Sequence, residues 1–369
     1  MKHNYQPKPL FVERMKELLG LEDYEKYWGK IQERELKTIR TNTLKISVEE
    51  LKKRLEKKWR INQPFKKHPE IMIIEGKIID EKSANENLED VNKNLKKDYD
   101  IKNISAKSLA KPTLSHKNAS DSEHKLQELE PGELGRALEH LLGYYYIQEL
   151  ASMLPVLVLQ PKPNETILDL CSSPGSKTTQ IAAEMKNTGT IIANEISIKR
   201  IKILANNLER CGVSNAIITK KSGEVLCEKL QKEGFVFDKI LIDAPCSGEG
   251  TIKSTPKTLQ MWSINTIKTL SKLQKKLLSS AIEILKPNGE IVYSTCTHSP
   301  EENEEVLDFV LKKFPNIKIE KITLPVKFRE GITKWKDKEY LEEVKDSCRI
   351  YPHISDTEGF FIAKLRKIK

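Results

Sequence analysis

Two cysteines stand where a strand should end, and each of them could act as a nucleophile. Cys246 lies in DAPCSG, at residues 243–248, and Cys296 lies in STCT, at residues 294–297. Each stretch follows a run of β-branched and other apolar residues, which is typical of a buried strand. A thiolate attacks electrophilic carbon, so two thiols at neighbouring strand ends could support covalent catalysis.

A third strand end has the pattern of a ligand-binding turn. DLCSSPGSKT, at residues 169–178, reads as a strand, a tight turn at Gly175 and a helix that opens at Lys177. Such a turn lets a ligand approach the backbone closely. The phosphate-binding P-loop pattern requires glycine where Cys171 and Ser176 stand, and the dinucleotide pattern GxGxxG fails because only one of its glycines is present. The turn therefore does not predict a phosphate cradle.

The next predicted strand ends at Glu195, whose carboxylate could accept hydrogen bonds from both ribose hydroxyls of a nucleoside. Without a phosphate cradle, the ligand that fits is a nucleoside without phosphates, such as S-adenosylmethionine. The alternative is an ordinary strand-to-helix turn that Ser173 or Ser176 caps, with Glu195 at the start of a helix. The residues alone leave these two interpretations equally open.

The chain that carries these motifs alternates between strand-like and helical segments. Strands are expected at residues 166–170, 190–196, 215–220, 238–244 and 290–296. Helices are expected at residues 177–186, 197–212, 264–286 and 301–314. This alternation predicts a parallel sheet with helices on both faces, whose ligands bind beyond the carboxyl ends of the strands. The cysteines, the glycine turn and the acidic residue should therefore line one crevice.

The composition divides the chain into three parts. Residues 1–80 read as a small α+β domain, residues 81–130 as a flexible insertion or linker, and residues 131–369 as the domain with the motifs. The elements expected in the first part are a helix that stops at Gly20, strands at 38–46 and 70–79, and a helix at 48–58. The middle part is rich in Asn, Lys and Ser, so it buries too little apolar surface to order itself alone.

The 369 residues carry a formal net charge of +10, which favours an acidic or polyanionic partner. The six cysteines form no CxxC pair, so we expect free thiols and no metal site. The first residues, MKHNYQPKPLFVERM, lack the apolar segment of a secretory signal, and no run of about 18 apolar residues is present. We therefore expect a cytoplasmic protein in a reducing compartment, without a membrane partner.

Several longer stretches resemble the Sun-type (nucleolar protein/Sun) family of S-adenosylmethionine-dependent RNA cytosine-5 methyltransferases. They are GYYYIQELASMLP, DLCSSPGSKTTQIAAEMKNTGTIIANEISIKR, DAPCSGEGTIKS, YSTCTHSPEENE and YPHISDTEGFFIAKLRK. The resemblance covers residues 131–367 and is greatest to the tRNA-modifying members. It implies an α/β fold: a Rossmann-like methyltransferase domain, with a mostly parallel seven-stranded sheet and helices on both faces, after a small α+β domain that helps to hold RNA.

The resemblance implies an enzyme that moves the methyl group of S-adenosylmethionine to carbon 5 of a cytosine in RNA. It assigns Cys296 as the nucleophile that attacks carbon 6, and Cys246 as the group that releases the product. Asp243 would hydrogen-bond the base, and Lys177 would favour the thiolate or orient Asp243. Chemistry alone allows the cysteines to exchange roles, because DNA cytosine-5 methyltransferases attack with a Pro-Cys pair such as Pro245–Cys246. The choice of Cys296 rests on the resemblance.

The resemblance also assigns the binding of S-adenosylmethionine to residues at several strand ends. They are Cys171, Ser172, Ser173, Pro174, Gly175, Ser176, Lys177, Glu195, Arg200, Ser222 and Asp243. The expected partner is RNA, with tRNA favoured and ribosomal RNA second, because no separate RNA-binding module accompanies the compact catalytic domain. We expect a monomer without a metal ion.

Two other functions fit parts of the sequence. A non-catalytic RNA-binding assembly factor could retain the fold and the cofactor pocket, but it would have no need of both Cys246 and Cys296. A methyltransferase of small molecules would leave the basic N-terminal unit without a purpose. The sequence therefore favours the RNA methyltransferase over both alternatives.

Overall fold

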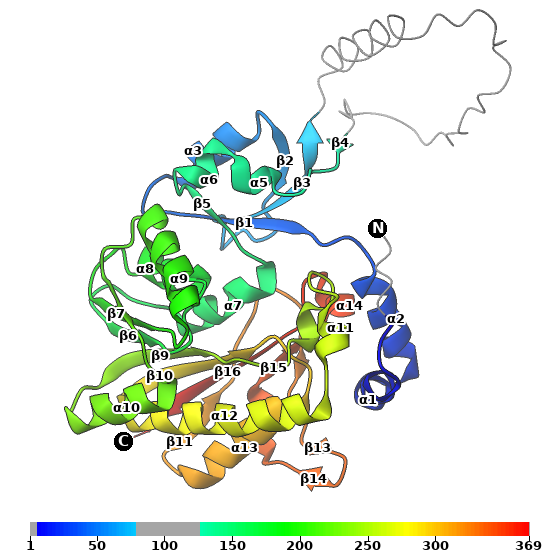
Figure 1. The fold of residues 1–369 in the computed structure, drawn as a ribbon, viewed down its shortest axis with the longest axis vertical. Helices are drawn as coiled ribbons and strands as arrows, with labels where there is room; N and C mark the ends of the chain where they lie inside the picture. Colours follow the sequence, from blue (N-terminus) through cyan, green and yellow to red (C-terminus); the bar gives the residue numbers. More distant parts are fainter. Residues whose placement is uncertain (1–5, 79–125, 369) are drawn as a thin grey trace, which may run out of the picture.

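The computed structural model describes residues 6–78 and 126–368, which form a small sheet and a large sheet below it (Figure 1). The insertion predicted at 81–130 lies outside the described residues, except for residues 126–130. No helix within the described ranges combines the length and the apolar character that a membrane span requires.

The small sheet has the strand order β2–β3–β1–β5, with β4 beside β3, and all of its pairs are antiparallel. Its strands are β1 Lys37–Thr41, β2 Trp59–Asn62, β3 Ile71–Ile78, β4 Leu126–Gln127 and β5 Tyr145–Ile147. One face is covered by helices α3 Val48–Leu55, α5 Glu133–Arg136 and α6 Leu138–Leu141 (Figure 1). Leu51 and Leu55 lie one helical turn apart on α3, so both face the sheet and pack with Ile39 and Trp59.

The strand expected at 38–46 ends at Thr41, because the side chain of the next residue turns the chain. Asn42 Nδ2 donates to the carbonyl oxygen of Gly143 at 2.8 Å and to that of Cys211 at 2.7 Å. An asparagine that bonds to nearby backbone competes with the strand ladder. The same bonds join the end of β1 to the part of the chain that surrounds the large sheet.

The described residues form a nine-stranded large sheet with a parallel centre. Its strand order is β12–β15–β16–β10–β9–β6–β7–β8, and β11 also pairs with β16. The parallel strands are β6 Thr166–Asp169, β7 Thr190–Asn194, β8 Ala216–Thr219, β9 Phe237–Asp243 and β10 Leu285–Thr295. These are the strands that the alternating pattern predicted, and the predicted motifs follow their carboxyl ends.

The prediction of seven strands is wrong, and the difference lies at the antiparallel edge of this sheet. β16 Phe360–Lys367 pairs with β10, and its other edge is shared by two short strands, β11 Ile317–Glu320 and β15 Cys348–Ile350. β12 Arg329–Glu330 then pairs with β15. Each short strand covers only half of β16, so two strands occupy the place of one, and β12 brings the sheet to nine strands.

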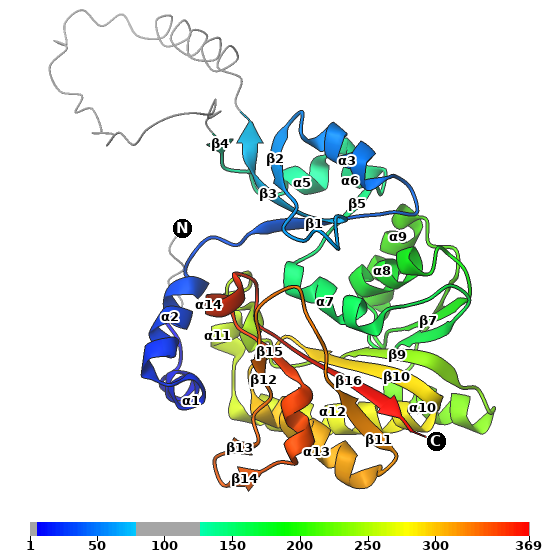
Figure 2. The ribbon, with the colours of Figure 1, turned by 180° about the vertical axis from the view of Figure 1, so that it is seen from behind.

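Helices cover both faces of the large sheet (Figures 1 and 2). On the side of the small sheet lie α7 Leu150–Leu159, α8 Ser176–Glu184 and α9 Ile198–Cys211, and on the other side lie α10 Gly223–Lys232, α12 Ile264–Glu283 and α13 Glu304–Lys313. The central strands are apolar on both faces, and Ile240, Leu241 and Ile242 of β9 are all buried. The helix predicted at 301–314 is divided at Asn303, where a short 3-10 helix gives way to α13.

The first two helices pack on the large-sheet side of the molecule and not on the small sheet. They are α1 Pro9–Leu19 and α2 Leu21–Ile31. Phe11 and Tyr27 are buried in one apolar cluster with Trp262 and Tyr351. Strand β5 lies beyond residue 131 in the chain and yet completes the small sheet. The division of the chain at residues 80 and 131 stays a prediction. Helices α1 and α2 belong to its first part but pack with residues of its last part, and β5 belongs to its last part but pairs with a strand of the first.

Candidate active site

Cys246 and Cys296 lie side by side, just beyond the carboxyl ends of β9 and β10. These strands are parallel neighbours, with Asp243 opposite Ser294, and the two Sγ atoms are 3.3 Å apart. The hydrogen bond between the thiols, followed by burial, raises the pKa of the Cys246 thiol well above its ordinary value. Cys246 therefore keeps its proton at neutral pH. The prediction that the two thiols meet is confirmed.

Lys177 and Asp243 form an ion pair at the same edge of the sheet. Lys177 Nζ lies 2.7 Å from Asp243 Oδ2 and donates to Ser152 Oγ at 2.9 Å. Ser294 Oγ donates to Asp243 Oδ1 at 2.9 Å. Lys177 is only 6% exposed, and its ammonium group lies 5.3 Å from the ring centre of Phe360. Both charged groups are therefore held in fixed positions beside the thiols' strands.

The turn after β6 is bonded to the end of β7 and the start of α9 by serine side chains. Ser172 donates to the carbonyl oxygen of Asn194 through both its backbone N–H and its Oγ, each at 2.9 Å. Ser173 Oγ donates to the carbonyl oxygen of Arg200 at 3.1 Å, and Arg200 Nη2 donates to that of Ser173 at 2.7 Å. These reciprocal bonds fix the turn against the neighbouring strand end.

Gly175 ends this turn, at the N-terminus of α8. Its φ of 103° lies in the region that favours glycine, and a Cβ atom there would lie 3.0 Å from Leu204 Cδ1 of α9. Asn207 of α9 donates from Nδ2 to the carbonyl oxygen of Pro174 at 2.9 Å. Ser176 then begins the helix. The close contact of the turn with α9 therefore requires a residue without a side chain at position 175.

Glu195 follows β7 directly and is 3% exposed. Its Oε1 accepts a hydrogen bond from the backbone N–H of Ser197 at 2.8 Å, and its Oε2 lies 3.2 Å from Arg200 Nη1. The carboxylate therefore stands beside the Ser173 turn, held by the residue that also bonds to this turn. A carboxylate has about four acceptor positions, so it retains capacity for a ligand's hydroxyl groups.

Asn194, to which the motif analysis gave no role, is bonded to the residues that precede Cys171 and Ser222. Asn194 Nδ2 donates to the carbonyl oxygens of Leu170 and Lys221, both at 3.1 Å. Ser222 occupies the N-cap position of α10, and its side chain forms no capping bond there. Burial raises the pKa of the Cys171 thiol, which therefore stays protonated. The signal for Asn194 in the sequence was a single amide side chain at the end of an apolar strand.

Asp169 is a second residue that sequence reasoning did not assign to the site. It is completely buried at the end of β6, where its Oδ2 accepts from Thr178 Oγ1 at 2.7 Å. Its Oδ1 has no hydrogen-bond partner among the described residues. Burial raises the pKa of this carboxyl to about 7. A buried carboxylate oxygen without a donor fits a ligand that brings an ammonium group, as S-adenosylmethionine does.

Burial also governs the three remaining cysteines outside the site. Cys211, Cys227 and Cys348 are buried, and burial raises the pKa of each thiol. Across residues 6–78 and 126–368, no three His, Cys, Asp or Glu side chains are grouped so that they could hold a metal ion.

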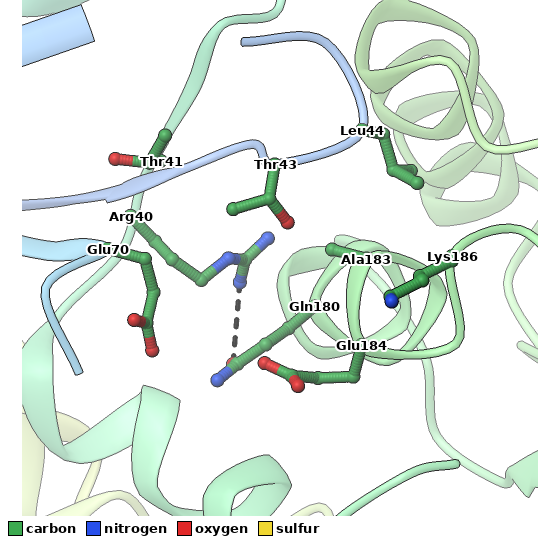
Figure 3. A pocket seen from close by; sticks show the side chains of 9 residues that line it. All are labelled: Arg40, Thr41, Thr43, Leu44, Glu70, Gln180, Ala183, Glu184 and Lys186. Atoms are coloured by element: carbon green, nitrogen blue, oxygen red, sulfur yellow. Dashed lines mark hydrogen bonds between the residues drawn. The ribbon is translucent and has the colours of Figure 1, made fainter. Parts of the chain in front are cut away.

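A cavity of about 570 Å³ lies between the end of β1 and α8 (Figure 3). Its lining residues are Arg40, Thr41, Thr43, Leu44, Glu70, Gln180, Ala183, Glu184 and Lys186. None of the predicted site residues contributes to it. The cavity therefore lies where the small sheet contacts α8, a helix that covers the large sheet, and it is separate from the thiols.

Arg40 crosses this contact and bonds to the first turns of α8. Its guanidinium group donates to the carbonyl oxygen of Ser176 at 2.9 Å, to Thr179 Oγ1 at 2.8 Å and to Gln180 Oε1 at 3.4 Å (Figure 3 shows the last bond). It also donates to Gln148. Within the described part of the chain it has no carboxylate partner, and burial lowers its pKa to about 10. Strand β1 is thus fixed to the helix that begins at the ligand-binding turn.

Comparisons with known proteins agree with this geometry. The model of the family described as 16S rRNA methyltransferase RsmB/F matches residues 156–366. The chain is 38% identical to a tRNA (cytosine(49)-C(5))-methyltransferase of Pyrococcus abyssi over 94% of this chain and 93% of that protein. It is 43% identical to ribosomal RNA small subunit methyltransferase F of Aliivibrio salmonicida, but it spans only 49% of the length of that relative.

Two solved structures resemble the whole chain. A methyltransferase homologue from Pyrococcus horikoshii has a TM-score of 0.73 and 31% identity, with 99% of this chain and 96% of that chain covered. NSun6 from the same organism, solved with SFG, has a TM-score of 0.72 and 27% identity, with 98% of each chain covered.

Proposed function

This chain belongs to the RsmB/F family of Sun-type RNA cytosine-5 methyltransferases, and on that basis we propose that its substrate is a cytosine in tRNA. Its reaction uses S-adenosylmethionine as the methyl donor. The observation that supports catalysis by this chain is the contact of 3.3 Å between Cys246 Sγ and Cys296 Sγ. An assembly factor without catalysis would have no use for two thiols in contact, so the contact supports the enzyme.

Carbon 5 of cytosine is a poor nucleophile, so the ring must be activated before it can accept a methyl group. When it is bound, S-adenosylmethionine supplies that group on a positively charged sulfur. We assign Cys296 as the thiolate that adds to carbon 6, which moves the electron pair of the C5–C6 double bond to carbon 5 for the transfer. The raised pKa of Cys246, caused first by its bond with Cys296 and then by burial, fits a thiol that keeps its proton until release.

Product release needs the second thiol. Once Cys296 is bonded to carbon, it no longer shares a proton, and the largest cause of the raised pKa of Cys246 is removed. Cys246 can then give its proton to solvent and act as the base that takes the proton from carbon 5. The electrons of that C–H bond restore the C5–C6 double bond as the bond from carbon 6 to Cys296 breaks.

Lys177 and Asp243 are assigned to the activation of the base. The carboxylate of Asp243 can accept a hydrogen bond from the cytosine amino group while Lys177 and Ser294 hold it in place. Lys177 also brings a positive charge to the edge where a thiolate forms, and a nearby cation favours a thiolate. The fixed positive charge of Lys177 can stabilise a negative charge that develops on the ring without reorganisation.

We assign cofactor binding to the turn after β6 and to the acids at the ends of β6 and β7. The free oxygen of Asp169 suits the ammonium group of S-adenosylmethionine, and Glu195 suits its ribose hydroxyls. The backbone of residues 171–177 would contact the rest of the S-adenosylmethionine molecule. Arg200 is bonded to Ser173 of the same turn, and Asn194 is bonded to Lys221, the residue before Ser222. Both Arg200 and Ser222 are therefore assigned to the cofactor site.

The choice of tRNA over ribosomal RNA rests on length. The match with the tRNA enzyme covers 94% of this chain and 93% of that protein, whereas the match with the ribosomal RNA enzyme covers only 49% of that relative. The test is to incubate the protein with unmodified total tRNA or with 16S rRNA and S-adenosylmethionine, followed by bisulfite sequencing. We expect new 5-methylcytosine in tRNA only. Methylation confined to the 16S rRNA would replace the proposed substrate, and no methylation of either would favour the assembly factor.

A further inference from the structure

The thiols of Cys246 and Cys296 stand on loops that the strand ladder does not reach. The register of β9 and β10 ends with the pair Asp243 and Ser294, before either cysteine. Beyond it, the backbone N–H of Gly250 donates to the carbonyl oxygen of Cys296 at 2.9 Å. The distance between the two thiols therefore depends on this bond and on the side chains that join one loop to the other.

Glu249 is such a side chain, and it is 3% exposed. Its Oε2 accepts hydrogen bonds from Thr297 Oγ1 at 3.0 Å and from the backbone N–H of His298 at 3.1 Å. Its Oε1 accepts from Ser299 Oγ at 2.8 Å and from Trp262 Nε1 at 2.7 Å. The carboxylate of Glu249, three residues after Cys246 in the chain, thus accepts hydrogen bonds from three successive residues of the loop that begins at Cys296.

The residues that follow the two cysteines, Ser247 and Thr297, are joined by a hydrogen bond whose direction the same carboxylate sets. Ser247 Oγ and Thr297 Oγ1 are 2.7 Å apart, and either hydroxyl could be the donor. An ionised carboxylate only accepts, so the hydroxyl proton of Thr297 points to Glu249 and Thr297 must accept from Ser247. Glu249 therefore fixes the direction of a hydrogen bond between the immediate neighbours of both thiols.

We propose that Glu249 is a positioning residue that holds Cys246 at the distance from Cys296 that product release requires. The inference rests on the proposed function, in which attack uses Cys296 alone and release uses both thiols. A change at Glu249 should therefore slow release more than it slows attack.

Glutamine cannot replace Glu249, although it has nearly the same shape. Each carboxylate oxygen faces one hydroxyl, which can turn to accept, and one N–H group, which cannot. On one side this group is the Trp262 indole N–H, and on the other it is the backbone N–H of His298. In either orientation, the amide NH₂ of a glutamine would meet an N–H donor, which leaves buried donors without acceptors.

The test is a single-turnover reaction of Glu249→Gln with S-adenosylmethionine and the RNA that the wild type methylates. A denaturing gel measures the covalent protein–RNA adduct, and bisulfite sequencing measures the product. We expect the adduct to form and then to decay about tenfold more slowly than in the wild type, or slower still. The adduct should therefore accumulate in E249Q.

A second substitution supplies a rescue that a merely structural role would not give. Trp262→Phe removes the indole N–H, so the amide NH₂ of a glutamine at 249 can point to that side and donate to Ser299 Oγ. We expect E249Q/W262F to release its adduct faster than E249Q, although W262F alone improves nothing. If E249Q does not fold, Thr297→Val, which removes the hydroxyl bonded to Ser247 and Glu249 but leaves the other bonds of the carboxylate, should show the same slow release in milder form.

Glu133→Gln is the matched control, because Glu133 also accepts from an indole N–H, that of Trp59, but in the small sheet. E133Q should leave adduct decay unchanged. Equal adduct decay in E249Q and the wild type, or slow decay that W262F does not relieve, would overturn the positioning role. A wild type that methylates no RNA at all would instead overturn the proposed function on which the inference rests.

Discussion

Ser294 stands directly opposite Asp243 in the ladder of β9 and β10, and its hydroxyl donates to the Asp243 carboxylate. Lys177 occupies the other oxygen of the same carboxylate. Because two parallel strands set this register, the carboxylate has one orientation before any substrate arrives. The remaining acceptor positions of Asp243 are thus preorganised for the amino group of a base.

Asp243→Asn should slow methyl transfer without trapping an adduct. An amide keeps the shape of the side chain but removes the negative charge and turns one acceptor into a donor, so the ring is activated less. We expect a fall of about a hundredfold or more in the single-turnover rate, with no extra adduct on a denaturing gel. A strong adduct band in this variant would place Asp243 in release and not in activation.

Cys296→Ala and Cys246→Ala should stop the reaction at different stages. Without Cys296 no bond to carbon 6 can form, so we expect neither adduct nor product. Without Cys246 attack and transfer remain possible, so the adduct should accumulate on a denaturing gel after incubation with RNA and S-adenosylmethionine. An adduct that accumulates with Cys296→Ala and is absent with Cys246→Ala would exchange the two roles and make Cys246 the nucleophile.

The affinity for S-adenosylmethionine should fall as the pH falls below about 7, where the raised pKa of Asp169 lies. Binding of an ammonium group favours the ionised carboxylate, so below this pKa a proton must leave when the ligand binds, at a cost that grows by up to about tenfold in affinity per pH unit. Calorimetry from about pH 5.5 to 7.5 measures the effect. Asp169→Asn should bind more weakly and lose this dependence; the same slope in both proteins would exclude Asp169 as its source.

Arg40→Met should lower the free energy of unfolding by about 1–3 kcal/mol, because the acceptors on Ser176 and Thr179 lose a buried donor. Urea denaturation of the full chain measures this change. Arg34→Met is the control, since Arg34 forms an exposed ion pair with Glu128 and should change stability by only about 0.5 kcal/mol or less. Equal effects of the two substitutions would show that Arg40 does not carry the contact between the sheets.

The parallel centre of the large sheet could be predicted because its strands are buried on both faces and separated by amphipathic helices. The antiparallel edge could not, since β12 and β15 have only two and three residues and are too short to show a period. Helix α7 was also missed: it contains Pro155 and is apolar on all sides, so no helical stripe distinguishes it. The position of α1 and α2 depends on contacts with Trp262 and Tyr351, which no local pattern reveals.

The site was predictable where the place of a residue in a motif is fixed. The two cysteines and Lys177 belong to this class. Asp169, Asn194 and Glu249 stand inside quoted motifs, but a single sequence does not show that each forms its hydrogen bonds inside the fold. The partners of Asn194 and Glu249 lie on other strand ends, and that of Asp169 lies on the helix after its own strand. Such residues are found only after the fold has brought their partners together.

The helices that precede and follow the small sheet in the chain pack on the large-sheet side of the molecule. α1 and α2 precede it and lie in a cluster with Trp262, and α7 follows β5 directly and packs on the large sheet. The small sheet is therefore anchored at two points, so a swing like that of a domain on one linker would require both anchors to bend together. The two sheets should keep one spacing whether or not RNA is bound, so the cavity that Arg40 lines between them should keep a constant width.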